Sequence, residues 1–315
     1  MVISKEFLML SRINRALKRH FFFSLIHMSI CVIACADNDI VITDIGENDK
    51  ILYKRNSENV RGYYDSLIIT QWNIGHFSGG SNPNSTIKPD NFSQAIQNYK
   101  DLFDRTNSDI CSINEYSVDI GCDSQGYRYK AHETLFANFE NFYIGNQRNY
   151  SCNAIFSHLA LDNVQLVEYM CNMTAKITHT NLISATDYYF IESTIHVNGI
   201  EIKLVSTHLA FDQNNTEIAL YQIEELIDRY RNDDYVILCG DWNISNVSVF
   251  DPFLAADYQL ANHGKFGDFI TYGNNSILDN VIVKGLTISE VELVNSQLSD
   301  HKPLVVTLKL DSYNN

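Results

Sequence analysis

The sequence predicts an α/β sandwich with mixed β-sheets. Strand-like and helix-like segments alternate from about residue 66 onwards. Asn198-Gly199 joins two alternating, β-branched segments, and both residue types accept the positive φ of a two-residue hairpin turn. At least one strand pair is therefore antiparallel, which favours a sandwich over a parallel, doubly wound sheet. With 45% hydrophobic and 19% charged residues among 315, the chain can bury a full core without metals or disulfides.

Hydrophobic periodicity defines the expected elements. Apolar side chains recur at helical spacing near 90–105 and again from Thr216 to Arg231. Short β-branched runs bounded by turn-forming residues indicate strands. These strands are expected at 67–74, 109–114, 188–197, 200–208, 235–240, 277–283 and 304–310. The chain has no internal repeat and no long linker after residue 65, so 66–312 is predicted to be one domain.

The N-terminus predicts export. Residues 1–34 contain five basic residues and one acid, and an apolar run of signal-peptide length that is too short for a comfortable membrane span. The run ends in Val-Ile-Ala-Cys, which resembles a bacterial lipoprotein signal and implies that Cys35 is lipidated and anchors the protein to a membrane or cell surface. An ordinary cleaved signal peptide is the alternative. Residues 35–65 are expected to be an acidic tether and lead-in.

The mature chain is expected to be strongly acidic. Without residues 1–34 it has 18 Lys and Arg against 37 Asp and Glu, a net charge of −19. A general nucleic-acid-binding surface is normally basic. Any polyanionic substrate must therefore meet a local strip of charge or a metal ion. The composition argues against tight non-specific DNA binding but leaves a metal-dependent nuclease open.

The seven cysteines give no support to a zinc ribbon, because none of them forms a Cys-x-x-Cys pair. Cys111 and Cys239 lie in strand-like runs and are expected in the core. The remaining cysteines of the folded region lie in a loop-rich stretch, where two of them could form one disulfide in an exported protein. They are Cys122, Cys152 and Cys171.

Polar side chains follow or begin several of the predicted strands. The stretch Ile-Leu-Cys-Gly-Asp-Trp-Asn-Ile-Ser at 237–245 places Asp241 and Asn243 directly after a buried run. In open α/β sheets, sites form beyond the carboxyl ends of strands. Acidic, amide and imidazole groups without a thiolate suit a hard divalent cation such as Mg²⁺ or Mn²⁺. The other side chains of this kind are Asn73, Glu115, His208, Asp279, Asp300 and His301.

The spacing of Asp241 and Asn243 sharpens this interpretation. They lie two residues apart, so in an extended chain both side chains point to the same side. Gly240 leaves room for a close backbone approach or an unusual φ. A simple turn cap is the alternative. Taken singly, four other residues also have structural explanations. His208 could be a packed histidine and Glu115 an edge residue. Asp300 could be a cap, and Asn73 could hold a loop.

Together, and in this order, the polar segments resemble the endonuclease/exonuclease/phosphatase superfamily, which includes deoxyribonuclease I, repair endonucleases and neutral sphingomyelinases. The resemblance covers roughly residues 66–310. It implies a four-layer α/β sandwich with two mixed β-sheets packed face to face. The segments that carry it are TQWNI, DICSINE, VSTHLA, GDWNIS, LDNVIV and SDHKPLVVTL.

The resemblance implies a metal site. Glu115 is expected to be the principal ligand with Asn73 beside it, and Asp300 is expected to support the site. The expected ion is Mg²⁺, with Mn²⁺ or Ca²⁺ as alternatives. Asn153 matches a family asparagine that contacts the phosphate of the substrate.

The resemblance also implies groups around the scissile phosphate. His301 is expected against that phosphate, with Asp279 hydrogen-bonded to it to fix its tautomer. Asp241 and Asn243 are expected to position the attacking water and a phosphate oxygen. His208 is expected to protonate the leaving oxygen or to stabilise charge on the phosphoryl group. Whether His301 or Asp241 takes the proton of the water stays open.

The expected function is metal-dependent hydrolysis of phosphoesters by an exported, monomeric, nuclease-like phosphodiesterase with nucleic acid as substrate. A sphingomyelinase-like enzyme that acts on lipid head groups, or another small phosphoester hydrolase, is the alternative. The inositol-polyphosphate 5-phosphatase branch is disfavoured, because that branch carries a Trp-Cys-Asp-Arg type of stretch where this chain has Leu278-Asp279-Asn280-Val281. A non-catalytic binding protein of the same fold is a third possibility, but every expected site position is filled.

Overall fold

The computed structural model describes residues 40–44, 50–54, 63–80, 86–145, 152–170, 188–210 and 216–310. All of them belong to one compact unit, residues 38–315. The predicted signal peptide and the lipid anchor on Cys35 lie outside the described residues. Within the described ranges, no helix has the length and apolar character needed to cross a bilayer.

The larger sheet contains eight strands of the described chain and has mixed pairing. β3 and β4 run parallel, and β16 is antiparallel to β3. The order across the sheet is β1-β2-β7-β8-β4-β3-β16-β15. In that order the strands are Ile40–Asp44, Lys50–Lys54, Asn141–Ile144, Ala154–Ser157, Ile110–Asn114, Ser66–Asn73, Leu304–Lys309 and Thr287–Leu293.

The second sheet contains six described strands in the order β13-β14-β12-β11-β10-β9. β11 and β12 are parallel, whereas β14 is antiparallel to β12. β10 and β11 form the predicted hairpin, and Asn198 and Gly199 at its turn have φ values of 50° and 81°. The strands are Tyr258–Leu260, Asp279–Lys284, Val236–Asp241, Ile200–His208, Tyr189–Val197 and Asp162–Glu168, and a separate two-stranded sheet consists of β5 (Asp119–Cys122) and β6 (Arg128–Lys130).

The two large sheets pack face to face. Ile69 of β3 and Val306 of β16 share one buried apolar cluster with Ile237 of β12 and Val281 of β14. All four side chains are completely buried. The alternation of side chains along each strand therefore sets one row of each strand into this core and the other row outward.

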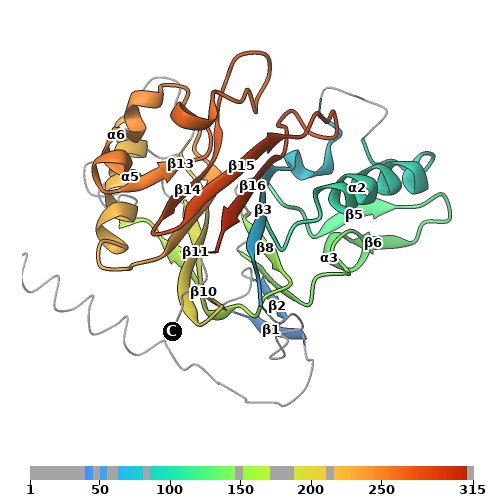
Figure 1. Ribbon diagram of the computed structural model, residues 1–315. Helices are drawn as coiled ribbons and strands as arrows, with labels where there is room; N and C mark the ends of the chain where they lie inside the picture. Colours follow the sequence, from blue (N-terminus) through green and yellow to red (C-terminus); the bar gives the residue numbers. More distant parts are fainter. Residues whose placement is uncertain are drawn as a thin grey trace, which may run out of the picture. The chain divides into compact units, whose positions relative to one another are not determined.

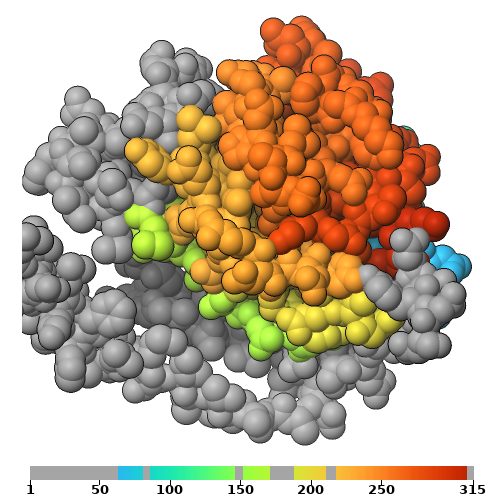
Figure 2. Space-filling view, turned by 60° about the vertical axis from the view of Figure 1, so that its left-hand side comes forward, coloured from blue at the N-terminus to red at the C-terminus, as the bar shows by residue number. Residues whose placement is uncertain are grey.

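Helices cover the outer faces of both sheets (Figure 1). α2 (Phe92–Thr106) packs Tyr99 and Leu102 against Trp72 on the outer face of the larger sheet. On the other side, Ile223 and Leu226 of α5 pack over the smaller sheet. Figure 2 shows this second face, where the orange part of the chain lies next to the yellow and light-green parts. The remaining helices are α3 (Ala131–Thr134), α5 (Thr216–Arg229) and α6 (Asp251–Ala255), with 3-10 turns η1 (Gly75–Phe77), η3 (Val247–Phe250) and η4 (Gly264–Phe266).

The predicted four-layer sandwich is confirmed, since the layers are helix, sheet, sheet and helix. Both predicted helices and all predicted strands are present within two residues of their expected ends. The tether expected over 35–65 is different in the structure, because β1 and β2 lie in this range; β2 pairs with β7 of the larger sheet, and β1 pairs with β2 at the edge of that sheet. Ile-Val-Ile-Thr and Ile-Leu-Tyr have high strand propensity, which the neighbouring acidic residues obscured.

The cysteines of the described chain are free thiols. Cys111 and Cys239 are buried in the core as expected. Cys122 and Cys152 are not bonded to each other or to another described cysteine. Cys171 lies outside the described residues.

Candidate active site

The inward-facing row of several strands changes from apolar to polar toward one end of the sandwich. On β3 the row runs Leu67, Ile69, Gln71, Asn73, and every side chain in it is buried. β4, β11 and β12 change in the same direction, and β14 begins with its polar residue because it is antiparallel to β12. The rows on these strands end in Asn114, His208, Asp241 and Asp279. The polar ends therefore meet at one edge of the interface between the two sheets.

Asp241, the last residue of β12, lies at the centre of this group. Its Oδ2 accepts a hydrogen bond of 2.9 Å from Nδ2 of Asn73 on the opposite sheet. The same oxygen lies 3.5 Å from Nε2 of His208 and 3.6 Å from Nε2 of His301. Only 1% of the Asp241 side chain is exposed. One buried carboxylate oxygen therefore faces two imidazole nitrogens and one amide.

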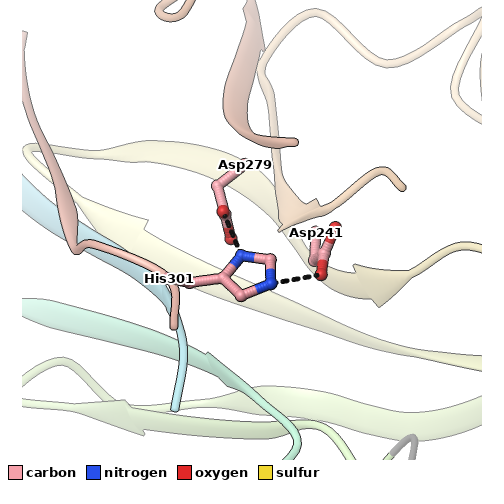
Figure 3. A group of neighbouring side chains, drawn as sticks. All are labelled: Asp241, Asp279 and His301. Carbon is pink, nitrogen blue, oxygen red and sulfur yellow. Dashed lines mark hydrogen bonds and ion pairs between the residues drawn. The ribbon is translucent and has the colours of Figure 1, made fainter. Parts of the chain in front are cut away.

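His301 is held between two carboxylates (Figure 3). Its Nδ1 lies 2.7 Å from Oδ2 of Asp279, while its Nε2 faces Asp241. Burial by itself lowers the pKa of His301, but the charges of Asp279, Asp241 and Asp300 raise that pKa to about 10. The neighbouring carboxylates therefore favour the charged form of the imidazole.

Backbone contacts fix both partners of this pair. Oγ1 of Thr271 accepts hydrogen bonds of 3.0 Å from the amide groups of Leu278 and Asp279. The carbonyl oxygen of His301 accepts a 3.1 Å bond from Nε1 of buried Trp72. Trp72 in the apolar core thus helps to position His301, and Thr271 in the loop before β14 helps to position Asp279.

Glu115 follows β4 directly and lies next to Asn73. Nδ2 of Asn73 donates to Oε1 of Glu115 at 3.1 Å as well as to Asp241, and Oδ1 of Asn73 accepts from the amide of Gly75 at 3.1 Å. The Glu115 side chain is 29% exposed, in contrast to the buried Asp241 and Asp279. Glu115 has a φ of 49°, so the chain turns sharply where the strand ends.

Asp300 lies beside this loop and is exposed. Its Oδ1 accepts from Oγ of Ser299 at 3.2 Å, and Ser299 Oγ lies 2.8 Å from the carbonyl oxygen of Asn73. A Cβ on Gly75 would lie 3.3 Å from Asp300 Oδ1, so the two segments are in close contact. Asp300 therefore lies at the Asn73 side of the site.

Two sets of donors in the described chain are candidates for a cation. Asp241, Asp279 and His301 each offer a ligand atom within 4.8 Å of the others. However, Asp279 is fully buried, and its Oδ2 is already bonded to His301. Glu115 is more open and presents hard carboxylate oxygens of the kind that Mg²⁺ and Mn²⁺ prefer. The donor chemistry therefore fits a divalent cation at Glu115, with the Asp279–His301 pair as a hydrogen-bonded unit beside it.

Asn243 differs from the expected extended arrangement. β12 ends at Asp241, and Asn243 has a left-handed φ of 53°. Its backbone amide donates 2.9 Å to Oδ1 of Asp241, which is a turn closed by the aspartate itself. Its Nδ2 donates to the carbonyl of Leu209. The prediction that Asp241 and Asn243 point to the same side of an extended chain was wrong, because the hydrogen bond from the Asn243 amide to the Asp241 side chain accompanies the end of the strand.

Gly240 is required for space. A Cβ at this position would lie 2.4 Å from the carbonyl oxygen of Thr207 and 2.7 Å from its Cγ2. Thr207 and Gly240 are partners in the parallel pairing of β11 and β12. Of the two expected reasons for this glycine, the close backbone approach is thus the one found.

Asn153 is connected to the site from within the protein. Its Oδ1 accepts 2.8 Å from Nδ2 of Asn114, and its Nδ2 donates to the carbonyl of Tyr189. Asn114 in turn accepts from the backbone amide of Asp241 at 2.9 Å. Both ends of the Asn153 amide are engaged and the residue is 2% exposed, so this side chain holds Asn114 in place. Its expected contact with phosphate stays a prediction.

Several residues of the site were not expected. Asn114 and Gln71 form a buried network, in which Gln71 Nε2 donates to Asn114 at 2.6 Å and lies 3.3 Å from Asp279. Polar side chains in the inward row of an apolar strand are a signal that could have identified both. Tyr272, whose ring centroid lies 4.7 Å from that of His301, comes from a loop without any such pattern.

The fold and this set of groups define a phosphoester hydrolase. A family model described as Endonuclease/Exonuclease/phosphatase family matches residues 70–301. The chain belongs to this family. Its members generally depend on a divalent metal ion, in agreement with the donors at the site. No curated protein sequence matches the chain.

Solved structures share the fold at low sequence identity. D. rerio TDP2 in complex with a single-strand DNA product matches with 13% identity and a TM-score of 0.56, over 78% of this chain and 100% of that one. The human nocturnin catalytic domain with sulfate matches with 14% identity and a TM-score of 0.56, over 84% and 98%. An endonuclease/exonuclease/phosphatase from Bacteroides vulgatus matches with 13% identity and a TM-score of 0.57, over 79% and 100%.

Proposed function

We propose that this protein is an exported, Mg²⁺-dependent phosphodiesterase with nuclease-like activity. The observation that carries the proposal is the position of the Asp241 carboxylate between His208 and His301, with Asn73 linking it to Glu115. A phosphodiester repels nucleophiles, so its hydrolysis needs positive charge on the phosphate and an acceptor for the water proton. These residues provide both within one buried edge of the sandwich.

The cation is assigned to Glu115, with Asn73 and Asp300 at its side. Glu115 provides the most open carboxylate among the buried and half-buried groups that meet there. When bound, a divalent cation polarises the phosphoryl group and neutralises charge on its oxygens. Mg²⁺ is the expected ion, and Mn²⁺ or Ca²⁺ are the alternatives because carboxylate ligands suit all three.

The remaining catalytic roles are assigned to individual side chains. The His301 imidazole, which Asp279 orients through Nδ1 and whose charged form it favours, donates from Nε2 to a phosphate oxygen. Asp241 orients the attacking water and takes its proton, since it is the carboxylate that faces both imidazoles. His208, whose Nε2 lies 3.5 Å from Oδ2 of Asp241, donates a proton to the leaving oxygen. Asn243 is assigned to a phosphate contact, whereas Asn153, whose amide is engaged with Asn114 and Tyr189, is assigned to holding Asn114 in place.

Nucleic acid is the proposed substrate. The single-strand DNA product bound to D. rerio TDP2, which has the same fold, supports this choice. The half-exposed Tyr272 ring beside His301 offers a surface for a base. The net charge of −19 of the mature chain favours substrate contacts through the site itself rather than through a basic surface.

Export rests on the N-terminal sequence. The basic start, the apolar run and Cys35 support a lipoprotein signal followed by attachment to a membrane. Mass spectrometry of the mature N-terminus tests this directly, because an acylated Cys35 and an unmodified residue differ by the mass of the lipid. We further propose that the mature protein acts as a monomer.

The activity is tested on purified protein with plasmid DNA, single-stranded DNA, RNA and sphingomyelin, each with Mg²⁺ and with EDTA. We expect EDTA-sensitive hydrolysis of nucleic acid, which both His301→Ala and Glu115→Ala abolish without unfolding the protein. Hydrolysis of sphingomyelin alone would replace the nuclease proposal with a lipid head-group substrate. Near-wild-type turnover by either variant on the best substrate would refute the assigned site.

A further inference from the structure

His76 is brought to Glu115 by backbone pairing that continues past the ends of two strands. After β3 and β4 end, the amide of Ile74 donates to the carbonyl of Asn114 at 3.0 Å. The amide of His76 then donates to the carbonyl of Glu115 at 2.9 Å. This backbone pairing therefore places the side chains of His76 and Glu115 next to each other.

The imidazole of His76 has a fixed orientation toward the carboxylate. Nδ1 lies 3.1 Å from Oγ of Ser117, and Nε2 lies 3.6 Å from Oε2 of Glu115. A separation of 3.6 Å is too long for a good hydrogen bond. It is close to the separation of two neighbouring ligand atoms, which is about 3 to 3.5 Å when each bond to a cation is about 2.1 Å.

Asn73 does not present its side-chain oxygen to a cation at Glu115. Its Nδ2 faces Oε1 of Glu115, and its Oδ1 is bonded to the amide of Gly75. In this arrangement Asn73 links Glu115 to Asp241 rather than presenting its oxygen to the same cation. The ring nitrogen of His76 lies instead at the other oxygen of Glu115, Oε2.

The backbone at this point is held in an uncommon conformation. His76 has φ 53° and ψ 26°, and Phe77 and Glu115 have φ values of 61° and 49°. Non-glycine residues in the left-handed region are uncommon and gather at functional sites. Phe77 is buried among Tyr99 and Tyr116, which anchors the turn that directs His76 toward Glu115.

We infer that Nε2 of His76 is a ligand of the cation at Glu115, and that this imidazole raises the affinity of the site for a first-row transition ion such as Mn²⁺ more than its affinity for Mg²⁺. Imidazole binds transition ions more strongly than Mg²⁺, whereas carboxylates accept both. Ser117 orients the ring by accepting from Nδ1, which leaves the lone pair of Nε2 toward the ion. The inference rests on the proposed function only in placing a cation at Glu115.

Metal affinity of the purified, metal-free chain measures this without any turnover. Titration calorimetry with Mn²⁺ and with Mg²⁺ is compared between the wild type and His76→Asn, because asparagine tolerates the positive φ. We expect the Kd for Mn²⁺ to rise by about 10-fold or more, and the Kd for Mg²⁺ to change by less than about threefold. His196→Asn is the control, since His196 is half-exposed on β10 and pairs with Asp162 instead.

A second readout identifies the nitrogen directly. Pulsed electron paramagnetic resonance of the Mn²⁺-loaded wild type is expected to show coupling to an imidazole nitrogen, and His76→Asn is expected to lose it. Ser117→Ala keeps the histidine and is expected to weaken Mn²⁺ binding by a smaller factor, so it serves if His76→Asn does not fold. Unchanged Mn²⁺ affinity in His76→Asn, or in Ser117→Ala if only that variant folds, overturns the inference.

The proposed function and this inference fail in different ways. Glu115→Gln is expected to lose binding of both ions. If it binds both as the wild type does, the cation is not at Glu115 and the proposed site is wrong. If it loses both ions while His76→Asn binds Mn²⁺ normally, only the inference about His76 is wrong.

Discussion

Oδ2 of Asp279 lies 2.7 Å from Nδ1 of His301, and this pair determines which ring nitrogen of the histidine faces the site. Asp279 is fully buried at the start of β14, and His301 approaches it from the segment before β16. Asp279 belongs to the smaller sheet, whereas His301 lies just before β16 of the larger sheet. Their hydrogen bond thus joins the halves of the sandwich at the point where the chemistry takes place.

Asp279→Asn tests the importance of this pair. The amide can hydrogen-bond to the ring but no longer raises the pKa of His301, so we expect kcat to fall by about 10²-fold with the fold retained. Steady-state kinetics and the circular dichroism melting curve measure the two effects. Asp268→Asn is the control, because Asp268 is 2.7 Å from His263 in an exposed pair of the same type. Equal losses in both variants would argue against a specific role of Asp279.

Gly240→Ala tests the contact between β11 and β12. The new Cβ would lie 2.4 Å from the Thr207 carbonyl oxygen, so the strand must shift and move Asp241 away from His208. We expect the free energy of unfolding to fall by about 1–3 kcal/mol. Urea denaturation measures this loss, and kcat should fall with it. A wild-type midpoint would show that the strands separate without cost.

Glu192→Gln tests a pH-dependent contribution to stability. Burial raises the pKa of Glu192, but hydrogen bonds from Arg229, Tyr230 and Gln165 outweigh burial and leave it below the usual 4.5. Because the folded pKa is depressed, the contribution is present above about pH 4.5 and is lost as the pH falls through the folded value.

We therefore expect Glu192→Gln to be less stable than the wild type at pH 7, by about 1 kcal/mol, and the difference to shrink at pH 3. Urea denaturation at both pH values measures the difference. Glu201→Gln provides the comparison, since Glu201 pairs with Lys203 at the surface and should change stability little. A destabilisation by Glu192→Gln that is the same at both pH values would contradict the charge-based explanation.

Tyr272→Ala tests the ring that packs on His301. The Tyr272 side chain is 39% exposed and its ring is tilted by 47° against the imidazole. Loss of a stacking surface for a base costs about 1–3 kcal/mol, so KM for an oligonucleotide should rise about 5- to 100-fold while Tyr272→Phe stays near the wild type. Tyr221→Ala removes another exposed tyrosine on α5 and should leave KM unchanged. A change in kcat alone would assign Tyr272 to the orientation of His301 instead.

The architecture could largely be predicted, because it depends on local patterns. The alternation of β10 and β11 and the Asn198-Gly199 turn specify a hairpin within one continuous segment. β1 and β2 could not be predicted in the same way, since β2 pairs with β7 about 90 residues further along the chain and β1 joins the sheet through β2. Short edge strands of this kind are defined by their partners more than by their own sequence.

The candidate site could be predicted only in part. His208 and Asp241 end strands that are themselves easy to identify, and the structure brings them within 3.5 Å. The conformation of Asn243 could not be predicted from spacing, because a side-chain hydrogen bond from Asp241 ends the strand and no rule of alternation applies after it. The role of Thr271 depends on the fold of a loop, which the sequence does not specify.

The hydrogen bonds that join the two sheets near the site have a consequence for how this enzyme loses activity. Ser112 Oγ lies 2.8 Å from Ser206 Oγ, and Asn114 Nδ2 donates 2.8 Å to the carbonyl of Thr207, so directional bonds join sheets that otherwise share a largely apolar core. Apolar contacts permit small sliding, whereas these bonds permit one alignment. These hydrogen bonds thus hold the two sheets in one alignment. Catalytic activity should therefore fall as soon as one sheet shifts relative to the other. Mild denaturant should silence the enzyme while its secondary structure is still intact.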